Sequence, residues 1–493
     1  MEVLLSLSPF LCLAVGTLLL MLVDAFSKQS PGLPLGLALT FLASAAFSVS
    51  IWFYGVERLE HASSFLSPWL LIDRTTLFLI ALLCLGGCLS ALLAGGYLKE
   101  HLLERGEFYP LLAFSTFGAL MTAAAGDMLT LFLGLETMSI GAYAMIGYRR
   151  GSLRATEAAL KYFLLGSFAA AIMLYGIAFL YGATGHTDLA GLRTVITQHE
   201  QSPLVVIGLM LLLVGLLFKV SAVPFHMWTP DAYEGAPTPS TAFMAIVVKG
   251  AAFAMILRTL LGVFGDVNAM SWAAGWPPVL GVIAFASMTF ANLIAARQES
   301  VKRMLAYSSI AHAGYILVGV LINSPGSTVG SASVLFYLTA YTVSTAGAFG
   351  SLIACGSRNA EAVSYQDLAG LGRRHPMPAL AFSFFILSLA GIPPTAGFLG
   401  KWFILQATIQ GECHLFALFI LLNSVLAAYY YLRVIVYLYM KEPNEWDPVA
   451  RPMHSSYVTA ALVISAILVI ALGISPSYPL ALASAAAVIP AGG

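Results

Sequence analysis

Residues 211–228 read LLLVGLLFKVSAVPFHMW, an apolar run that contains Lys219 and, five residues later, Pro224. A membrane-spanning helix needs about 20 mostly apolar residues, and this run comes close to that length. Proline lacks a backbone N–H and its ring clashes with the preceding turn, so it breaks or kinks a helix. Irregular backbone at membrane depth is tolerated only where it lines a wet cavity or is buried in protein. The stretch therefore predicts a broken transmembrane helix with a lysine beside the break.

A second stretch has the same arrangement further along the chain. Residues 389–402 read LAGIPPTAGFLGKW, in which a proline pair and two glycines precede Lys401. Transporters place broken helices at corresponding positions of two structural repeats. The breaks at 220–226 and 391–398 therefore favour a repeated architecture, with two unrelated proline kinks as the alternative.

The composition indicates the same class of protein. Of the 493 residues, 59% are hydrophobic and only 9% are charged, and the mean hydropathy is +0.88. Soluble domains carry about 25% charged residues, so this chain could not cover a water-facing surface. The net charge is zero, which gives no sign of a nucleic-acid partner. We expect an all-α integral membrane protein.

Apolar runs between charged or Pro/Gly-rich breaks predict fourteen spans. Their approximate limits are 3–25, 33–54, 75–97, 108–125, 128–147, 158–182, 204–222, 239–262, 277–296, 302–322, 331–355, 377–411, 413–440 and 456–474. The segment 377–411 is too long for one straight span and contains prolines. The breaks thus fall in spans 7 and 12, five spans apart. An odd offset makes two five-span repeats, spans 4–8 and 9–13, inverted relative to each other.

Lysine and arginine in the loops provide an independent test of this span count, because they gather on the cytoplasmic side of a membrane protein. One set of alternating loops holds Lys28, Lys99, Arg105, Arg149, Arg150, Arg154, Arg297, Lys302, Arg303, Arg358, Arg373, Arg374, Lys441 and Arg451. The opposite loops hold only Arg58, Arg74 and Arg193. The asymmetry supports fourteen spans with both termini outside. The predicted spans divide the chain into an N-terminal segment at 1–100, repeats at 108–262 and 277–440, and a last helix at 456–474.

Motifs for bound cofactors are absent from the sequence. Its five cysteines are scattered without a CxxC or iron–sulfur spacing, and neither GxGxxG nor a P-loop occurs. If redox chemistry or ATP drives this protein, we expect that chemistry on another chain. The N-terminus lacks a basic region and a cleavage site, so we expect a retained first helix.

Charged residues inside the predicted spans are the main functional signal. A charge at the bilayer centre costs about 2.5–3.5 kcal/mol on insertion scales, so it is rarely accidental. Glu136 and Lys249 each lie near the middle of a span, and Lys219 and Lys401 lie beside the breaks. Inert ion pairs between helices are the alternative interpretation. The lysines outnumber the single deep carboxylate, so most of them lack a matching acid, and an unmatched buried lysine can load and release protons.

The other polar residues in the spans give weaker signals. Lys161 lies one turn into its span with Glu157 four residues earlier, the spacing of an ordinary helix-surface pair. Arg258 and Arg433 lie nearer span ends, where they can reach the interface, and we expect structural roles for both. A buried histidine is more often a core residue than a ligand, but His226 and His312 could each pass a proton between their ring nitrogens. Ser308, Ser309 and Tyr315 accompany His312 and could hold water.

Several of these stretches together resemble the antiporter-like subunits of respiratory complex I and of multisubunit cation/proton antiporters. They are LFLGLETMSIGAYAMIGY (131–148), ALKYFLLGSFAAAIMLYG (159–176), LLFKVSAVPFHMWTPDAYEGAPTPSTAFMA (216–245), VKRMLAYSSIAHAGYIL (301–317) and LAGIPPTAGFLGKW (389–402). The likeness covers about spans 4 to 13. It implies fourteen helices with inverted repeats. Because the sequence ends soon after span 14, we do not expect the long lateral helix of the largest such subunit.

The resemblance also implies roles for individual residues. Glu136 and Lys219 would form a pair whose separation gates proton loading, and Lys249 would be the central relay. Lys401 would lie toward the periplasmic exit. Lys161 would modulate the pair, and His226 and His312 would lie along a central hydrophilic axis.

The family further implies a setting and a function. We expect a proton-translocating subunit of an NADH:quinone oxidoreductase in a bacterial inner membrane, with both termini on the periplasmic side. The other membrane-arm subunits would be its partners, and NAD, FMN, iron–sulfur clusters and quinone would be bound by partner chains. A subunit of a sodium/proton antiporter and a structural membrane subunit with inert ion pairs are the alternatives.

Overall fold

The computed structural model describes residues 2–26, 32–56, 65–198, 202–266, 268–273, 275–324, 326–356, 361, 363–443 and 452–488. Of the loop charges used to orient the spans, Lys28, Arg58, Arg358 and Arg451 lie outside these residues. The described part of the chain is helical and contains only three isolated β-bridges besides the helices.

The helices follow the predicted spans closely. Their bounds are α1 Glu2–Phe26, α2 Leu33–Tyr54, α4 Arg74–Glu100, α5 Phe108–Ala124, α6 Met128–Ile146, α7 Leu153–Thr184, α8 Leu189–Gln198, α9 Pro203–Val220, α10 Thr229–Gly235, α11 Thr238–Phe243, α12 Lys249–Ile256, α13 Pro277–Ala295, α14 Val301–Leu321, α15 Val329–Cys355, α16 Leu371–Arg374, α17 Pro376–Ala390, α18 Ala396–Gln410, α19 His414–Tyr439, α20 Ser456–Ile474 and α21 Ser477–Ala485. Two π-helical segments, η2 Met244–Val248 and η3 Leu257–Leu261, flank α12, and a 3₁₀ turn, η4, covers Gln366–Leu368.

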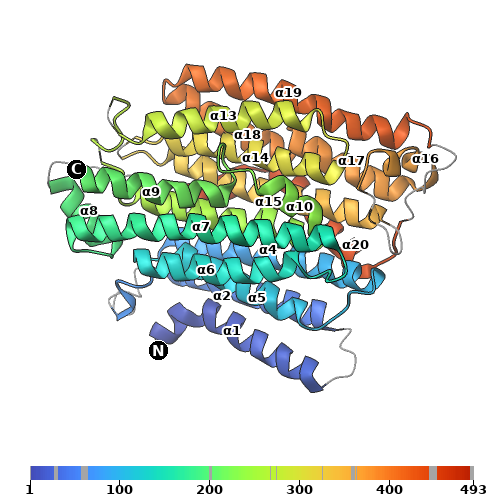
Figure 1. Ribbon diagram of the computed structural model, residues 1–493, viewed down its shortest axis with the longest axis horizontal. Helices are drawn as coiled ribbons and strands as arrows, with labels where there is room; N and C mark the ends of the chain where they lie inside the picture. Colours follow the sequence, from blue (N-terminus) through green and yellow to red (C-terminus); the bar gives the residue numbers. More distant parts are fainter. Residues whose placement is uncertain are drawn as a thin grey trace.

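In the described residues, 12 helices are long and apolar enough to cross a membrane, with α11 to η3 counted as one. Two shorter apolar helices, α5 and α17, complete the fourteen predicted spans. Figure 1 shows the long helices running side by side, with α1 at one edge of the bundle and α19 at the opposite edge. Polar side chains fix where several helices begin, because they accept hydrogen bonds from the free N–H groups of the first turn. Asp73, Asp127, Ser152, Ser202 and Ser300 cap α4, α6, α7, α9 and α14 in this way.

The packing of the helices repeats after five spans. Helix α5 packs against α6 as α13 packs against α14, and α6 contacts α7 as α14 contacts α15. Helix α7 packs against both halves of the first broken span, α9 and α10, as α15 packs against α17 and α18. The repeats predicted from the positions of the breaks therefore correspond to repeated helix packing.

Both predicted breaks are present, and each lies beside a lysine. Helix α9 ends at Val220, followed by Ser221 in the left-handed conformation with a φ of 64°. The chain resumes as α10, so span 7 extends beyond the predicted limit of residue 222. Helix α17 ends at Ala390, followed by Gly391 with a φ of 86°, a conformation that glycine adopts without steric cost. Segment 377–411 is therefore two helices, as its length and prolines predicted.

The two ends of the described chain lie on the same side of the bundle. Helices α1 and α4 begin on one side, since α2 runs back between them. Near the C-terminus, the carbonyl of Ala486 accepts a hydrogen bond from Thr75 Oγ1, 2.6 Å away, in the first turn of α4. The loops rich in lysine and arginine are at the other end of the helices.

Candidate proton-transfer site

Lys219, in the last turn of α9, is 3% exposed and is bound by hydroxyl groups. Its Nζ donates to Ser139 Oγ at 2.8 Å and lies 3.5 Å from the Tyr162 hydroxyl. The same nitrogen lies 5.1 Å from the ring centre of Tyr162 and 5.5 Å from that of Tyr143. Aromatic faces at this distance attract a cation, so the surroundings stabilise a charged lysine without a carboxylate in contact.

Glu136 lies on α6, three residues before Ser139, and is half-buried. Its Oε1 is buried and has no hydrogen-bond partner. Residues three apart on a helix share a face, so Glu136 and the Ser139 hydroxyl that holds Lys219 are neighbours. The carboxylate nevertheless lies outside the 4.0 Å ion-pair distance from Lys219 Nζ. The structure therefore shows the two groups close together but not joined.

Lys249 begins the short helix α12 between the two π-helical segments and is 1% exposed. Its Nζ donates to the carbonyl of Ser309 at 2.6 Å and also contacts Ser309 Oγ. π-Helical turns inside helices occur often at functional sites, and here one lies on each side of the lysine. Lys249 is thus fixed to α14, a helix of the second repeat.

His312 lies one turn after Ser309 on α14 and uses both ring nitrogens. Nδ1 lies 2.7 Å from the Tyr337 hydroxyl and Nε2 lies 3.0 Å from the Tyr431 hydroxyl, which also contacts Ser308 Oγ. A cavity of about 10 Å³ adjoins the imidazole and Tyr337, close to the space that one water needs. An imidazole with a hydroxyl on each nitrogen can accept a proton on one side and donate on the other.

Lys401, in the second turn of α18, points back at the break that precedes it. Its Nζ donates to the carbonyl of Ala390 at 2.9 Å and lies 5.3 Å from the ring centre of Tyr315. The rings of Tyr315 and His312 have centroids 5.9 Å apart. Lys401 therefore lies next to Tyr315, which packs against His312, on the side of the second break.

The three deep lysines share one kind of environment. Within the described residues, none of them has a carboxylate at ion-pair distance; each donates to hydroxyl or carbonyl oxygens. A neutral amine keeps two N–H donors, so these contacts suit both the ammonium and the amine. The arrangement does not match inert ion pairs and suits groups that change protonation state.

Lys161 belongs to a different, more exposed cluster. Its Nζ lies 2.6 Å from Glu157, the pair expected from the sequence spacing, and 2.9 Å from Asp231 on α10. Asp231 also binds Arg303 at 2.8 Å, and Arg303 reaches Glu234 at 2.9 Å. The cluster ties α7, α10 and α14 together. It thereby connects Lys161 to the second half of the broken span that carries Lys219.

His226 is the predicted site residue that the described contacts do not bring to the lysines. It lies in the break after Lys219, with its ring against Phe290 at a centroid distance of 5.9 Å and its Nδ1 without a partner.

The two arginines have structural contacts. Arg258 is 6% exposed and binds Asp73, the cap of α4, through two nitrogens at 2.6 and 2.7 Å. The Asp73 carboxylate was not part of the sequence interpretation because it lies just before a span. Arg433 lies over the ring of Tyr365 at 4.3 Å and donates to the carbonyls of Ala296 and Gln298. Both contacts fix helix ends and leave the guanidinium groups paired.

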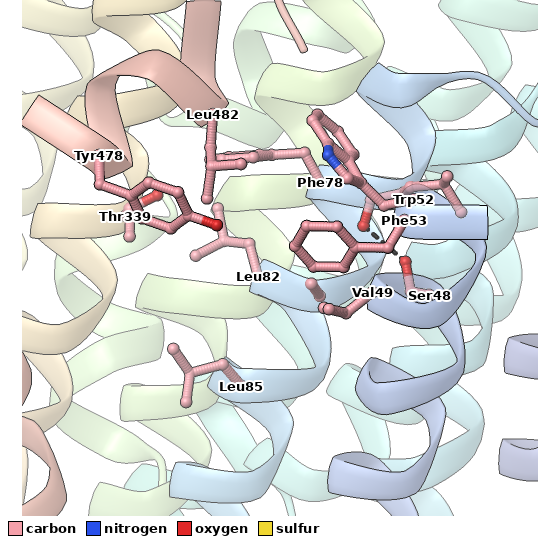
Figure 2. Close-up of a pocket in the computed structure, with 12 residues that line it drawn as sticks. Ser48, Val49, Trp52, Phe53, Phe78, Leu82, Leu85, Thr339, Tyr478 and Leu482 are labelled. Carbon is pink, nitrogen blue, oxygen red and sulfur yellow. Dashed lines mark hydrogen bonds between the residues drawn. The ribbon is translucent and has the colours of Figure 1, made fainter. Parts of the chain in front are cut away.

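An apolar cavity elsewhere in the bundle takes no part in this chemistry. Figure 2 shows it between α2, α4, α15 and α21, with Trp52, Phe53, Leu82 and Tyr478 among its lining residues. Its volume is about 370 Å³, and none of its lining side chains is charged. A proton path needs ionisable groups or water, so we exclude this cavity from the site.

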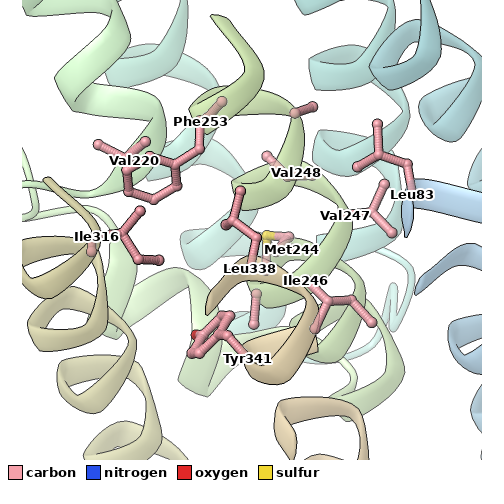
Figure 3. Packing of buried hydrophobic residues seen from close by; sticks show 14 of the residues in the cluster. Leu83, Val220, Met244, Ile246, Val247, Val248, Phe253, Ile316, Leu338 and Tyr341 are labelled. Atoms are coloured by element: carbon pink, nitrogen blue, oxygen red, sulfur yellow. The ribbon is translucent and has the colours of Figure 1, made fainter. Parts of the chain in front are cut away.

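Apolar side chains surround the lysines. Figure 3 shows Val220, Val247, Val248, Phe253 and Ile316 among the closely packed residues. Val220 follows Lys219 in the chain, Val248 precedes Lys249, and α9 packs against α12. Apolar side chains thus pack around Lys219 and Lys249 outside their few polar contacts.

Sequence and structure comparisons agree with this geometry. The transmembrane family described as NADH:quinone oxidoreductase/Mrp antiporter matches residues 125–427. NADH-quinone oxidoreductase subunit N 1 of Sorangium cellulosum is 62% identical over 97% of this chain and 97% of its own length.

Solved structures show the same likeness. A chain of respiratory complex I from Thermus thermophilus with bound aureothin is 33% identical, with a TM-score of 0.78 over 97% of this chain and 99% of that chain. A chain of the Mrp complex from Dietzia sp. DQ12-45-1b superimposes with a TM-score of 0.81 over 98% of this chain and 96% of that chain, at 21% identity, and so shares the fold.

The chain belongs to the NADH:quinone oxidoreductase/Mrp antiporter family of transmembrane proteins. Within that family it is an antiporter-like subunit of the kind found in respiratory complex I, and it is similar over nearly its whole length to subunit N of bacterial NADH-quinone oxidoreductases.

Proposed function

We propose that this chain translocates protons through Glu136, Lys219, Lys249, His312 and Lys401 as a membrane-arm subunit of NADH:quinone oxidoreductase. The observation that carries the proposal is the binding of three buried lysines by hydroxyl and carbonyl oxygens, with no carboxylate in contact among the described residues. Isolated charges at membrane depth are costly, and they persist where ions or protons pass.

The mechanism is an electrostatic relay. When the Glu136 carboxylate approaches Lys219, it stabilises the ammonium form; when it withdraws, the proton is released toward Lys249. The Ser309 hydroxyl and the two faces of His312 then lead toward Lys401. Lys161 acts on the pair from outside, since its cluster includes Asp231 and Arg303 around the second half of the broken span.

Partner chains would supply the energy. The chain would carry no redox centre; NAD, FMN, iron–sulfur clusters and quinone would be bound by other subunits, and the other membrane-arm subunits would be its neighbours. In a bacterial inner membrane, the end of the bundle with the lysine- and arginine-rich loops would face the cytoplasm. Both termini would then be periplasmic.

Inside-out membrane vesicles with the assembled complex test the proposal. Replacement of Lys219 or Lys249 by alanine should lower NADH-driven proton uptake by about a hundredfold or more, since a positioned acid–base group contributes about that much or more to a rate. Normal proton uptake by both variants would contradict the relay. Sodium movement that persists without NADH would instead favour the sodium/proton antiporter.

A further inference from the structure

The end of the bundle with the lysine- and arginine-rich loops contains a polar cavity, called the basin below, whose Glu361 the proposed relay does not use. This cavity has a volume of about 860 Å³, and its lining includes Arg149, Glu234, Arg303 and Glu361. It lies where the loop after α6, the end of α10, the start of α14 and the segment after α15 meet. Its polar walls suit water rather than lipid.

Glu361 and Lys302 form a buried acid–base pair at the wall of this basin. The Glu361 side chain is 15% exposed, the Lys302 side chain is completely buried, and their charged atoms are 3.0 Å apart. Glu361 also contacts the Tyr97 hydroxyl and lies 3.6 Å from Arg149. Lys302 was expected among the loop charges, but it lies in the first turn of α14.

A buried histidine nitrogen without a hydrogen-bond partner lies next to this pair. His101 is 7% exposed, its ring lies tilted against that of Tyr97 at a centroid distance of 4.2 Å, and its Nδ1 has no hydrogen-bond partner. His101, Tyr97, Thr238 and Glu361 line a second cavity of about 10 Å³. Buried polar atoms are normally satisfied, and this cavity is close to the size that one water needs.

Polar groups lead from this pair to Lys249 along two helices that pack together. Lys302 Nζ donates to the carbonyl of Ala236 at the end of α10, and Tyr233 lies one turn earlier on that helix. The Tyr233 hydroxyl interacts with Ser309, whose carbonyl and hydroxyl bind Lys249. Ser309 lies two turns after Lys302, a rise of about 10 Å on α14.

We propose that Glu361 and Lys302 load protons from the basin into the path that ends at Lys249. A proton from basin water binds the Glu361 carboxylate, and the same proton later leaves toward the neutral amine of Lys249, so charge is conserved. Lys302 holds the Glu361 carboxylate in place and compensates its negative charge while the carboxylate is deprotonated. The inference rests on the proposed function, since it supplies an entrance to the relay.

The charges around Glu361 are consistent with this role. Burial raises the pKa of the Glu361 carboxyl to about 8, despite the neighbouring Lys302. Burial, Arg149 and Lys302 together lower the pKa of His101 to about 4, so the imidazole stays neutral. Lys302 and Arg149 favour loss of the Glu361 proton, and the carboxylate of Glu234 in the basin wall opposes it. A carboxyl with a pKa near the working pH can both bind and release a proton.

The test uses the assembled complex in inside-out vesicles with three variants. Glu361→Gln keeps oxygen and nitrogen atoms for Tyr97 and Lys302 but cannot titrate. We expect about tenfold slower NADH-driven proton uptake, with recovery in Glu361→Asp. Glu299→Gln is the matched control, because Glu299 is an exposed carboxylate beside the same basin. It should pump at the normal rate.

An infrared titration separates proton binding from a structural role. The intact complex should show a carboxylic C=O band that fades as the pH rises through about 8. This band should be missing in Glu361→Gln and present in Glu299→Gln. Normal pumping by Glu361→Gln, while Lys249→Ala fails, would overturn the entrance and leave the relay intact. Normal pumping by Lys249→Ala would overturn the relay itself.

Discussion

Lys219 Nζ donates to Ser139 Oγ at 2.8 Å, and Ser139 lies one turn from Glu136 on the same helix. The Lys219 nitrogen is therefore held beside the carboxylate by a hydroxyl instead of by the carboxylate itself. In the proposed relay this arrangement would correspond to the separated state of the pair, because Glu136 Oε1 has no hydrogen-bond partner. In the loaded state the lysine would exchange Ser139 for Glu136.

Replacement of Ser139 by alanine should favour the loaded state. Without the hydroxyl, Lys219 loses its shortest hydrogen bond and moves toward Glu136, so proton release slows. We expect NADH-driven proton uptake to fall about tenfold or more, because a hydrogen bond to a charged group contributes about 1.5–3 kcal/mol and about 1.4 kcal/mol is a factor of ten in rate. Thr137→Ala is the control, since Thr137 lies on the same helix, faces outward and binds only its own helix. Equal rates for both variants would contradict the role of Ser139.

The hydroxyls on His312 offer a second test. Tyr337→Phe removes the partner of Nδ1 and Tyr431→Phe removes the partner of Nε2, while the rings stay in place. Each variant should slow proton uptake several-fold, and the double variant should resemble His312→Ala. Tyr307→Phe on α14 provides the comparison, because Tyr307 is not bound to His312. Unchanged uptake in the double variant would show that the imidazole carries no protons.

The Asp73–Arg258 pair predicts a pH-dependent stability. Burial alone would raise the pKa of Asp73, but Arg258 and the bonds to Thr76 hold it below its usual value. A lowered carboxyl pKa contributes stability that is present above the ordinary value near 4 and is lost as the pH falls through the folded-state value.

Asp73→Asn should remove this contribution while it keeps the helix cap. We expect about 1–2 kcal/mol of destabilisation, less than for a fully buried pair, since the Asp73 side chain is 44% exposed. Thermal unfolding in detergent at pH 7 and well below pH 4 measures the effect, because the variant and the native chain should differ at pH 7 and converge once Asp73 is protonated in the folded state. Asp127→Asn changes a cap without an arginine partner, so its effect should be small. An equal loss of stability in both variants would show that the effect comes from the helix caps and not from the ion pair with Arg258.

Gly391 predicts a coupling between the second break and Lys401. A Cβ added at Gly391 would lie 3.1 Å from Lys401 Cδ, and the φ of 86° disfavours any other residue. Gly391→Ala should cost about 1–2 kcal/mol in backbone strain and should also slow proton uptake by displacing the lysine. Gly182→Ala on α7 serves as the control, because its Cβ would meet open space. Lower stability with normal proton uptake would contradict this coupling, because the strained break would then leave the function of Lys401 unchanged.

The sequence predicted the helices and the breaks because their signals are local. Apolar length, proline and the lysine–arginine asymmetry depend on neighbouring residues, and the breaks were found within a few residues of their predicted positions. The depth of Lys219, Lys249 and Lys401 followed from their distance to the span ends.

The partners of these residues depend on packing between distant helices and were not predictable in the same way. Tyr337 and Tyr431 look like ordinary aromatic residues in apolar spans, yet both bind His312. Lys302 looked like a loop charge because it stands beside Arg303, but the end of α10 covers it. Asp73 and Glu361 gave no signal either, since each lies outside a span and acquires its partner through the fold.

The apolar packing around the lysines has an electrical consequence. A transmembrane voltage falls mainly across the least conductive part of a path, and moving one charge through 100 mV requires about 2.3 kcal/mol. In the proposed relay, side chains such as Val220, Val248 and Phe253 would insulate the interval between Lys219 and Lys249. The same residues that stabilise the fold would then limit the leak of protons across the membrane while the complex is idle.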